Sequence, residues 1–432
     1  MRPNFTQCGQ DFLANAQGKY SQYLYHGKVQ GILASDGVRP DLITLHGCEV
    51  LCGTGNEYYP WKDASSTITT WVLPILGLLV QAPFETNKFL RTCSALARWV
   101  GSPIATLSYT LWNVKVMGKC ALMVDMATDC FDKTDQPTQE SDFSHLRDSL
   151  YILSVMNQYS VFEEWLEKGI DADAEKLLRI ALFSDALPLS SHEADPDTLP
   201  QARARLARSL RIFRKKGVVP VFVTMFWFLF ALAISIQSAF SEIGTNATAH
   251  ELAIGLLLSW LPVLILVSIV DRNPVATDAV KEQLNDFVNK VRDALLDGAS
   301  RTTYIQNISC TESDLEWTAN LPHVPSIGLK RYFFSQYAGQ GRVRWHYGVA
   351  HPILAHIEEN IVAAKGRGWL EDPSTKSALD RGIYNRSISG LRTFDFREIW
   401  QILSALVIVG GTITGAFTLS CTSTFHPFNR AG

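Results

Sequence analysis

The sequence is poor in cysteine and carries no excess of charge of either sign. Of its 432 residues, 19% are Asp, Glu, Lys or Arg, and the formal net charge is −3. Nucleic-acid-binding domains carry a basic surface, so this balance argues against nucleic acid as a partner. Eight cysteines are too few to frame a small disulfide-rich domain. The first residues also lack the apolar core of a cleavable signal peptide.

Catalytic and nucleotide-binding motifs are missing as well: there is no P-loop, G-x-S-x-G, G-x-G-x-x-G or H-E-x-x-H. His346, His351 and His356 recur in steps of five, which turn successive side chains by roughly 140° on an α-helix and scatter them. Asp171 and Asp173 resemble a two-carboxylate motif but fit the first turn of a helix better. We therefore expect no catalytic residue, metal site or cofactor, and a protein that is not an enzyme.

Long uncharged runs are what the sequence does contain. Val218–Phe240, Leu252–Val270 and Ile399–Ser420 hold no charged residue, and a hydrocarbon core about 30 Å thick needs about 20 apolar residues. Each run predicts a transmembrane helix. Thr67–Phe84 predicts a further, shorter one that contains two prolines. Trp99–Val114, diluted by Gly, Ser, Pro and Thr, fits a fifth span, a re-entrant segment or an interfacial helix.

The positions of Lys and Arg predict which side each segment faces, because basic residues near span ends stay in the cytosol. The stretch 203–216 holds seven basic residues and no acid, directly before the Val218 run, whereas 241–250 has no Lys or Arg. Four spans would leave the N-terminus outside, and a fifth would bring it inside. Both arrangements place 119–217 and 271–398 in the cytosol.

Apolar residues at helical spacing predict that these cytosolic regions are helical. Helices are expected over Asp142–Gly169, with a face running from Leu146 to Trp165, and over Val280–Leu295. Another is expected from about Pro352 to Lys365, after a region rich in Pro and Gly. Leu199–Phe213 has one apolar face and basic remaining faces, which is typical of a basic amphipathic helix.

The predicted fold is therefore all-α: a polytopic membrane protein with four or five transmembrane helices and a helical cytosolic lobe. Its expected segments are an extracytosolic Cys-containing region (1–66), the first transmembrane helix with a second candidate span (67–118), a cytosolic helical region ending in the basic amphipathic helix (119–217), a transmembrane hairpin (218–270), a second cytosolic helical region (271–398), the last transmembrane helix (399–420) and an extracytosolic tail (421–432).

Four groups of residues are candidates for specific contacts. Extracytosolic cysteines could form disulfides in three pairings, Asn4 starts a glycosylation sequon, and a GxxxG pair could pack helices within the chain or between copies. The basic helix either contacts anionic inner-leaflet lipid or only fixes the topology. The cysteines are Cys8, Cys48, Cys52 and Cys421; the glycines are Gly411 and Gly415; the basic residues are Arg203, Arg205, Arg208, Arg211, Arg214, Lys215 and Lys216.

One region resembles a known group of proteins. GCEVLCGTG at 47–55, YYPW at 58–61 and the run from STITTWVLPILGLLVQAPF to MGKCALMVDMA are similar to a family of uncharacterised multi-span membrane proteins from filamentous fungi. The resemblance covers roughly residues 4–130, and the later spans more loosely. It implies an extracytosolic Cys-bearing N-terminal region and no particular activity. Members of the family often extend further beyond the last span, so this chain resembles a short member or a truncated product.

The leading functional prediction is a non-enzymatic membrane protein, a scaffold or sensor component that acts by contacts with protein or lipid. Its partner is the lipid bilayer, and its location is the plasma membrane or an endomembrane. Because the three clear spans contain no ionisable residue, a coupled transporter is disfavoured. An uncharged pore or transporter for a neutral solute remains an alternative, as does a membrane enzyme with a cytosolic active site.

Overall fold

The structure is a computed structural model of the whole chain, and it divides into two units, residues 1–69 and 70–432, which are described separately. The residues it describes are 5–26, 42–52, 68–79, 93, 97, 100–128, 138, 140–166, 170–189, 198–214, 218–241, 246–270, 276–308, 311–320, 332–337, 348–381 and 399–425.

The first unit is a pair of short helices joined by a disulfide bond. Helix α1 (Phe5–Asn15) carries Cys8 and helix α2 (Leu45–Cys52) carries Cys52, and these two cysteines are bonded. A one-turn 3₁₀ helix, η1 (Ser21–Tyr23), lies between them in the chain. Gly47 of α2 approaches Tyr23 so closely that a Cβ at position 47 would overlap the Tyr23 ring. The disulfide and this close approach together hold α2 in place.

The second unit contains a lobe of mostly helical segments. Most of these helices have one face of buried apolar residues and another of polar and charged residues. In chain order they are α6 (Pro103–Met126), α7 (Asp142–Met156), β1 (Tyr159–Val161), η3 (Glu163–Leu166), α8 (Ile170–Phe183), α9 (Leu199–Ile212), α13 (Thr277–Leu296), α14 (Gly298–Ile308), η4 (Glu312–Asn320), β2 (Phe334–Tyr337), α15 (Ala350–His356), η5 (Ile357–Val362), α16 (Ala363–Lys365) and α17 (Pro373–Arg381).

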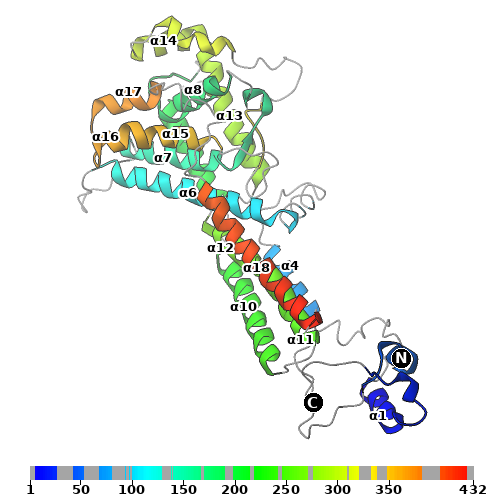
Figure 1. The fold of residues 1–432 in the computed structure, drawn as a ribbon. Coiled ribbons are helices and arrows are strands. Elements are labelled where there is room, and N and C mark those ends of the chain that lie inside the picture. Colours follow the sequence, from blue (N-terminus) through cyan, green and yellow to red (C-terminus); the bar gives the residue numbers. More distant parts are fainter. Residues whose placement is uncertain are drawn as a thin grey trace. The chain divides into compact units, whose positions relative to one another are not determined.

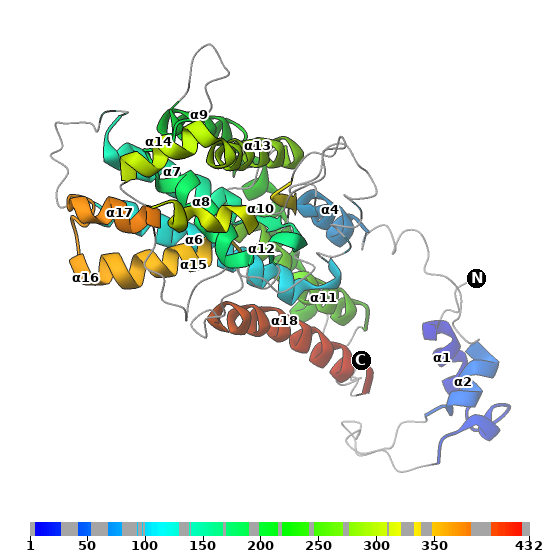
Figure 2. The same cartoon turned by 90° about the horizontal axis from the view of Figure 1, so that it is seen from above.

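Helix α8 lies at the centre of the lobe, where α7, α13 and α17 contact it (Figure 2). Its residues Leu177, Leu178 and Ala181 are completely buried. The apolar positions of α13 from Val280 to Leu295 are buried against the same core, as their spacing predicts. The lobe thus has one continuous hydrophobic core, and burial of these side chains is its main source of stability.

Two short strands close one side of the lobe. Strands β1 and β2 pair antiparallel, with Tyr159 opposite Tyr337. Asn285 of α13, which is 2% exposed, supports this pairing. Its Oδ1 accepts hydrogen bonds from the backbone N–H groups of Phe333 (2.8 Å) and Phe334 (2.7 Å). One buried amide therefore satisfies two backbone donors that would otherwise lie unpaired in the core.

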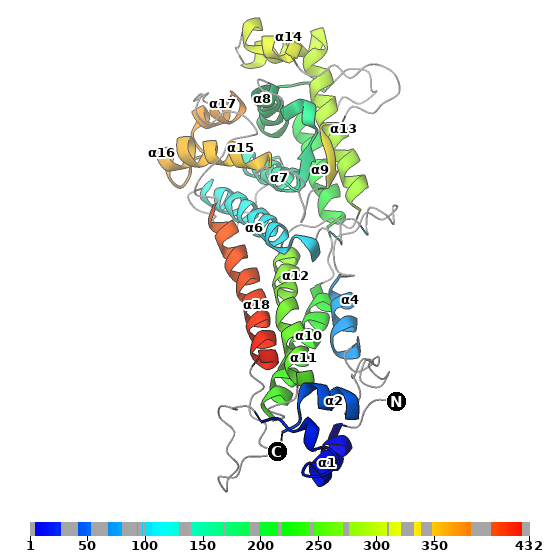
Figure 3. The ribbon, with the colours of Figure 1, turned by 45° about the vertical axis from the view of Figure 1, so that its right-hand side comes forward.

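The remaining helices of the second unit form an apolar bundle, side by side in Figures 1 and 3. They are almost free of charge, so their packing depends on apolar contact. The elements are η2 (Ile68–Val72, which belongs to this unit from residue 70 on), α4 (Leu73–Leu79), α10 (Val218–Ser241), α11 (Asn246–Leu258), α12 (Trp260–Val270) and α18 (Ile399–Phe425). Helices α11 and α12 are separated at Ser259, before Pro262, whose ring clashes with the preceding turn of a continuous helix.

The bundle interior is built around Trp71, which is 1% exposed. Its ring meets Phe228 of α10 edge-on, with the ring centroids 5.8 Å apart. On another side it lies directly on the backbone of α11 at Gly255, where a Cβ would lie 2.7–2.8 Å from two indole carbons. Gly255 is therefore a position where any side chain would displace Trp71.

The all-α prediction is confirmed at the level of fold class, because helices dominate and the described strands are one short pair. Among the described residues one helix, Ile399–Ser420, is long and apolar enough to cross a membrane, and 17% of its most apolar stretch is buried. The apolar helical stretches Ile68–Gly77, Phe222–Gln237 and Leu252–Val267 are shorter. The sequence predicted four or five spans, so that number stays a prediction.

Two segments differ from what the sequence predicts. The segment Trp99–Val114 does not end at Val114: helix α6 continues to Met126, carries Lys115, Lys119 and Asp125, and contacts α7, α12 and α18. Its first half contributes Leu107 to the core of the apolar helices, and its charged second half packs on the lobe core through Val116, Cys120 and Met123. The helix expected over Asp142–Gly169 ends at Met156, and the chain continues as β1 and η3.

Candidate functional site

Within the described part of the lobe, ionisable side chains from four segments meet at a small pocket beside the start of α7. The pocket encloses about 30 Å³, which is enough for a small ion or a water molecule. Its polar lining comes from α7, the loop after α8, α9 and α17, and its apolar lining from leucines and a phenylalanine. The lining residues are Asp142, His145, Leu146, Ser149, Leu182, Phe183, Asp185, Arg203, Leu370, Lys376 and Leu379.

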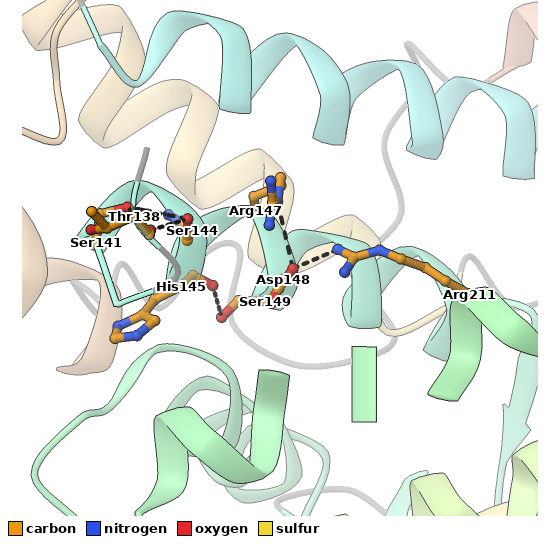
Figure 4. Close-up of polar contacts among 8 residues, drawn as sticks. All are labelled: Thr138, Ser141, Ser144, His145, Arg147, Asp148, Ser149 and Arg211. Carbon is orange, nitrogen blue, oxygen red and sulfur yellow. Dashed lines mark hydrogen bonds and ion pairs between the residues drawn. The ribbon is translucent and has the colours of Figure 1, made fainter. Parts of the chain in front are cut away.

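The start of α7 is fixed by a hydroxyl cap. The Ser141 Oγ accepts a hydrogen bond from the Ser144 backbone N–H at 3.3 Å, and both hydroxyls donate to the Thr138 carbonyl at 2.8 Å (Figure 4). Ser141 is extended and is the residue before the helix, as an N-cap should be. Asp142 follows it in the first turn, where the helix dipole favours a carboxylate.

Three side chains in this pocket have the chemistry of metal ligands. Asp142 and His145 are three residues apart on α7, so they share one face of the helix. Asp185 joins them from the bend after α8. One ligand atom from each of the three lies within 4.8 Å of the others. His145 Nδ1 is buried and has no hydrogen-bond partner, and Figure 4 shows the ring pointing away from the Ser141 cap.

Two cations already contact these carboxylates. Lys376 Nζ lies 2.6 Å from Asp142, and both side chains are about half exposed. The Arg203 guanidinium pairs with Asp185 and donates to the Ser184 carbonyl at 2.7 Å. Arg203 is 1% exposed, and its burial lowers the pKa of the guanidinium, which the charge and hydrogen bond of Asp185 oppose. The buried charge is stabilised by this pairing.

Ser149 also lines the pocket, but it does not form a nucleophile–base pair with His145. Its Oγ contacts two backbone carbonyls, that of His145 at 2.9 Å and that of Leu182. A serine nucleophile needs its hydroxyl directed at the imidazole ring. The described pocket therefore offers a cation-binding donor set but lacks the geometry of a Ser–His–Asp hydrolase.

The basic helix predicted to contact lipid is helix α9, and its apolar face packs against the core of the lobe. Leu199, Leu206 and Leu210 are buried in the core, so α9 cannot lay this face on a bilayer. Arg203 is buried, which corrects its assignment to a lipid-facing surface. Arg211 lies 2.5 Å from Asp148 and over the Tyr151 ring. Arg205, Arg208 and Arg214 are exposed, and Lys215 and Lys216 lie outside the described residues.

The other predicted site residues are distributed through the chain. Of the four candidate disulfide cysteines, Cys8 and Cys52 are bonded, Cys48 is a free thiol, and the Cys421 side chain lies outside the described part of α18. Asn4 lies outside the described residues too. A Cβ at Gly411 or Gly415 would meet no heavy atom within 4 Å, so the described chain leaves this glycine pair without a packing partner.

Two of the three histidines that recur in steps of five lie in the described residues. His346 lies outside the described residues, and His351 and His356 are buried in α15. His356 Nδ1 lies 3.3 Å from the guanidinium of Arg179, which is itself paired with Glu175 at 2.7 Å. Burial, and then the charge of Arg179, lower the pKa of His356 from 6.5 to about 4. His356 is therefore a neutral core histidine. Asp171 and Asp173 lie in the first turn of α8, as expected.

The sequence could not have identified the α7 pocket as a whole. The spacing of Asp142 and His145 was a usable local signal, but nothing near them marks Asp185 or Lys376 as neighbours. Comparisons of the chain with protein-family models, curated proteins and solved structures find no match. The resemblance to fungal membrane proteins therefore stays a prediction.

Proposed function

We propose that this protein is an integral membrane protein whose apolar bundle lies in lipid and whose helical lobe serves, without catalysis, as an interaction module in the cytosol. The observation that carries the proposal is the outer surface of the bundle. Large apolar side chains on α10 and α18 point away from the rest of the protein, and Phe226, Val407 and Phe417 are 68–69% exposed. Contiguous apolar surface of this kind is covered in native proteins.

Helices α10 and α18 carry apolar residues on their outer faces as well as on the faces packed inside the bundle. On α10 they include Phe222, Val223, Phe226, Trp227, Leu229 and Phe230, and on α18 they include Trp400, Leu403, Leu406, Val407, Ile413 and Phe417. A surface helix of a soluble domain carries polar residues on its outer face. Helices that are apolar on the outside as well as the inside are typical of a lipid environment.

The order of the segments supports a four-span arrangement with both ends of the chain outside the cytosol. Helix α4 connects the first unit to the lobe, α10 leaves the lobe, α11 and α12 return to it, and α18 leaves it again. The disulfide between Cys8 and Cys52 favours an oxidising compartment for the first unit. The exposed Arg208 and Arg214, shortly before α10, favour a cytosolic lobe.

The interior of the bundle favours an anchoring role over a pore. It is lined by Trp71, Phe228, Trp260 and neighbouring aliphatic side chains. Among the described bundle helices the buried polar side chains are Ser235 and Gln401. On the adjoining first half of α6, the buried Thr106 and Thr110 hydroxyls donate to carbonyls of their own helix. A path for a neutral solute would need a continuous polar lining, so the pore is the weaker hypothesis.

Fractionation of cells expressing the full chain tests the proposal. We expect the protein to remain in the membrane pellet after an alkaline carbonate wash and to dissolve only in detergent. A matched pair of variants sharpens the test: Phe226→Lys with Phe230→Lys on α10, and Phe162→Lys on the lobe. Lysine near the middle of a span costs about 2.5–3.5 kcal/mol each, so the α10 variant should lose membrane integration and the lobe variant should not. If the parent chain is released by the carbonate wash without detergent, or if the α10 variant stays in the pellet as the lobe variant does, the bundle is not in lipid.

A further inference from the structure

We propose that the α7 pocket is a binding site for a divalent transition-metal cation such as Zn²⁺, with Asp142, His145 and Asp185 as ligands. This inference concerns the lobe alone and is independent of the proposal that the bundle lies in lipid. It rests on three observations: the donor set, the unpartnered imidazole nitrogen, and a small pocket that all three side chains line.

The identity of the donors determines the class of ion. Two carboxylates and one imidazole, with further room for water, match three-ligand zinc sites that keep one coordination position open. Ca²⁺ and Mg²⁺ prefer a shell made only of oxygen, so the imidazole of His145 argues against them. The pocket should therefore select a borderline ion over a hard one.

The positions of the three donors need only a small adjustment. Donor atoms around tetrahedral Zn²⁺ lie roughly 3.4 Å apart, because each lies about 2.0–2.2 Å from the metal. The three donors now lie within 4.8 Å of one another, so side-chain movements that shorten these distances by up to about 1.4 Å would complete the site. Asp142 and His145 are held on one helical face by the capped start of α7, which fixes two of the three in advance.

The cations in the pocket determine how the metal would enter. Two carboxylates are balanced by Arg203 and Lys376, so the pocket has no spare negative charge while both cations stay in place. Lys376 is 49% exposed, whereas the Arg203 side chain is 2% exposed. The metal would therefore displace Lys376 from Asp142 into solvent, and Arg203 would remain on Asp185 and orient it. Lys376 is a competitor of the metal and Arg203 a positioning residue.

Competition between Lys376 and the metal for Asp142 can be tested, because a purely structural ion pair predicts no gain in metal affinity when Lys376 is replaced. Calorimetric titration of the purified full chain with Zn²⁺ alone should give one site. Asp142→Asn, His145→Gln and Asp185→Asn should each weaken binding by about 100-fold or more. Lys376→Gln should tighten it by about fivefold, because an exposed ion pair of ordinary strength no longer competes. The control is Asp278→Asn, which removes a similar surface ion pair with Lys281 on α13 and should leave the affinity unchanged.

Co²⁺ supplies a readout that does not depend on affinity. Bound Co²⁺ should give a visible absorption band that His145→Gln shifts or abolishes. Circular dichroism of each variant shows whether it is folded, and the gain expected for Lys376→Gln cannot arise from unfolding. The proposal is overturned if Lys376→Gln fails to tighten Zn²⁺ binding, or if the three ligand variants bind Zn²⁺ as the parent chain does.

Discussion

The contact between Trp71 and Gly255 leads to a quantitative prediction about the bundle. Gly255→Ala places a Cβ within 2.7–2.8 Å of two indole carbons, and Trp71 cannot retreat because Phe228 lies on it with a centroid separation of 5.8 Å. Overpacking of this kind costs about 1–3 kcal/mol, while replacing a helical glycine by alanine returns at most about 1 kcal/mol. With that gain subtracted in full, we expect a net destabilisation of up to about 2 kcal/mol.

The matched control is Gly411→Ala, also in an apolar helix. A Cβ there meets nothing within 4 Å, so only the gain in helix propensity remains and stability should rise by about 0.5–1 kcal/mol. Thermal unfolding of both variants in detergent micelles, followed by tryptophan fluorescence, should show Gly255→Ala to be less stable than the parent chain and Gly411→Ala to be more stable. The reasoning is refuted if the two variants shift stability equally. A loss for Gly411→Ala alone would mean that a second copy packs on this face.

Three further predictions concern the lobe and the first unit. Folding lowers the pKa of His356 from 6.5 to about 4, so below pH 6.5 the unfolded chain binds a proton at this residue that the folded chain does not. The free energy of unfolding should therefore be highest above pH 6.5 and should decrease as the pH falls toward 4. Urea unfolding at several pH values should show up to about 3 kcal/mol lost over that window, and His356→Gln should remove this slope. Asn285→Ala strands two buried N–H donors and should cost about 2–4 kcal/mol in urea unfolding, whereas the exposed Asn307→Ala should cost under about 1 kcal/mol. Replacing both Cys8 and Cys52, which lie 44 residues apart in the chain, by serine should destabilise residues 1–69 by about 4 kcal/mol, with faster hydrogen exchange over 5–26; unchanged exchange would contradict this.

The sequence predicted well those elements whose pattern is local. The apolar face of α13 and the helix from Ala350 to Lys365 follow from spacing alone, because each helix buries the residues that its own period places on one side. The continuation of α6 past Val114 was missed for the opposite reason. Its lobe contacts, such as Lys119 with Glu358 at 2.8 Å, come from residues far away in the chain.

The errors in the lobe have the same origin. Val161 and Trp165 continue the helical spacing of α7, yet they belong to β1 and η3. They are buried because β2, more than 170 residues later, supplies the strand that pairs with β1. The sequence pattern places Arg203 on a basic helix face. It is buried because its guanidinium forms an ion pair with Asp185 and donates a hydrogen bond to the Ser184 carbonyl. Partners of this kind cannot be read from the neighbourhood of a residue in the sequence.

Labelling from within the bilayer tests most directly the claim that lipid covers the bundle. The protein would be reconstituted in vesicles that contain a photoactivatable lipid, with the reactive group deep in the acyl chains, and the labelled residues would be mapped by mass spectrometry. We predict labels on the exposed faces of α10 and α18, at residues such as Phe226 and Phe417, and none on the equally apolar Ile212 of the lobe. Labels absent from both helices, or spread evenly over lobe and bundle, would contradict the account.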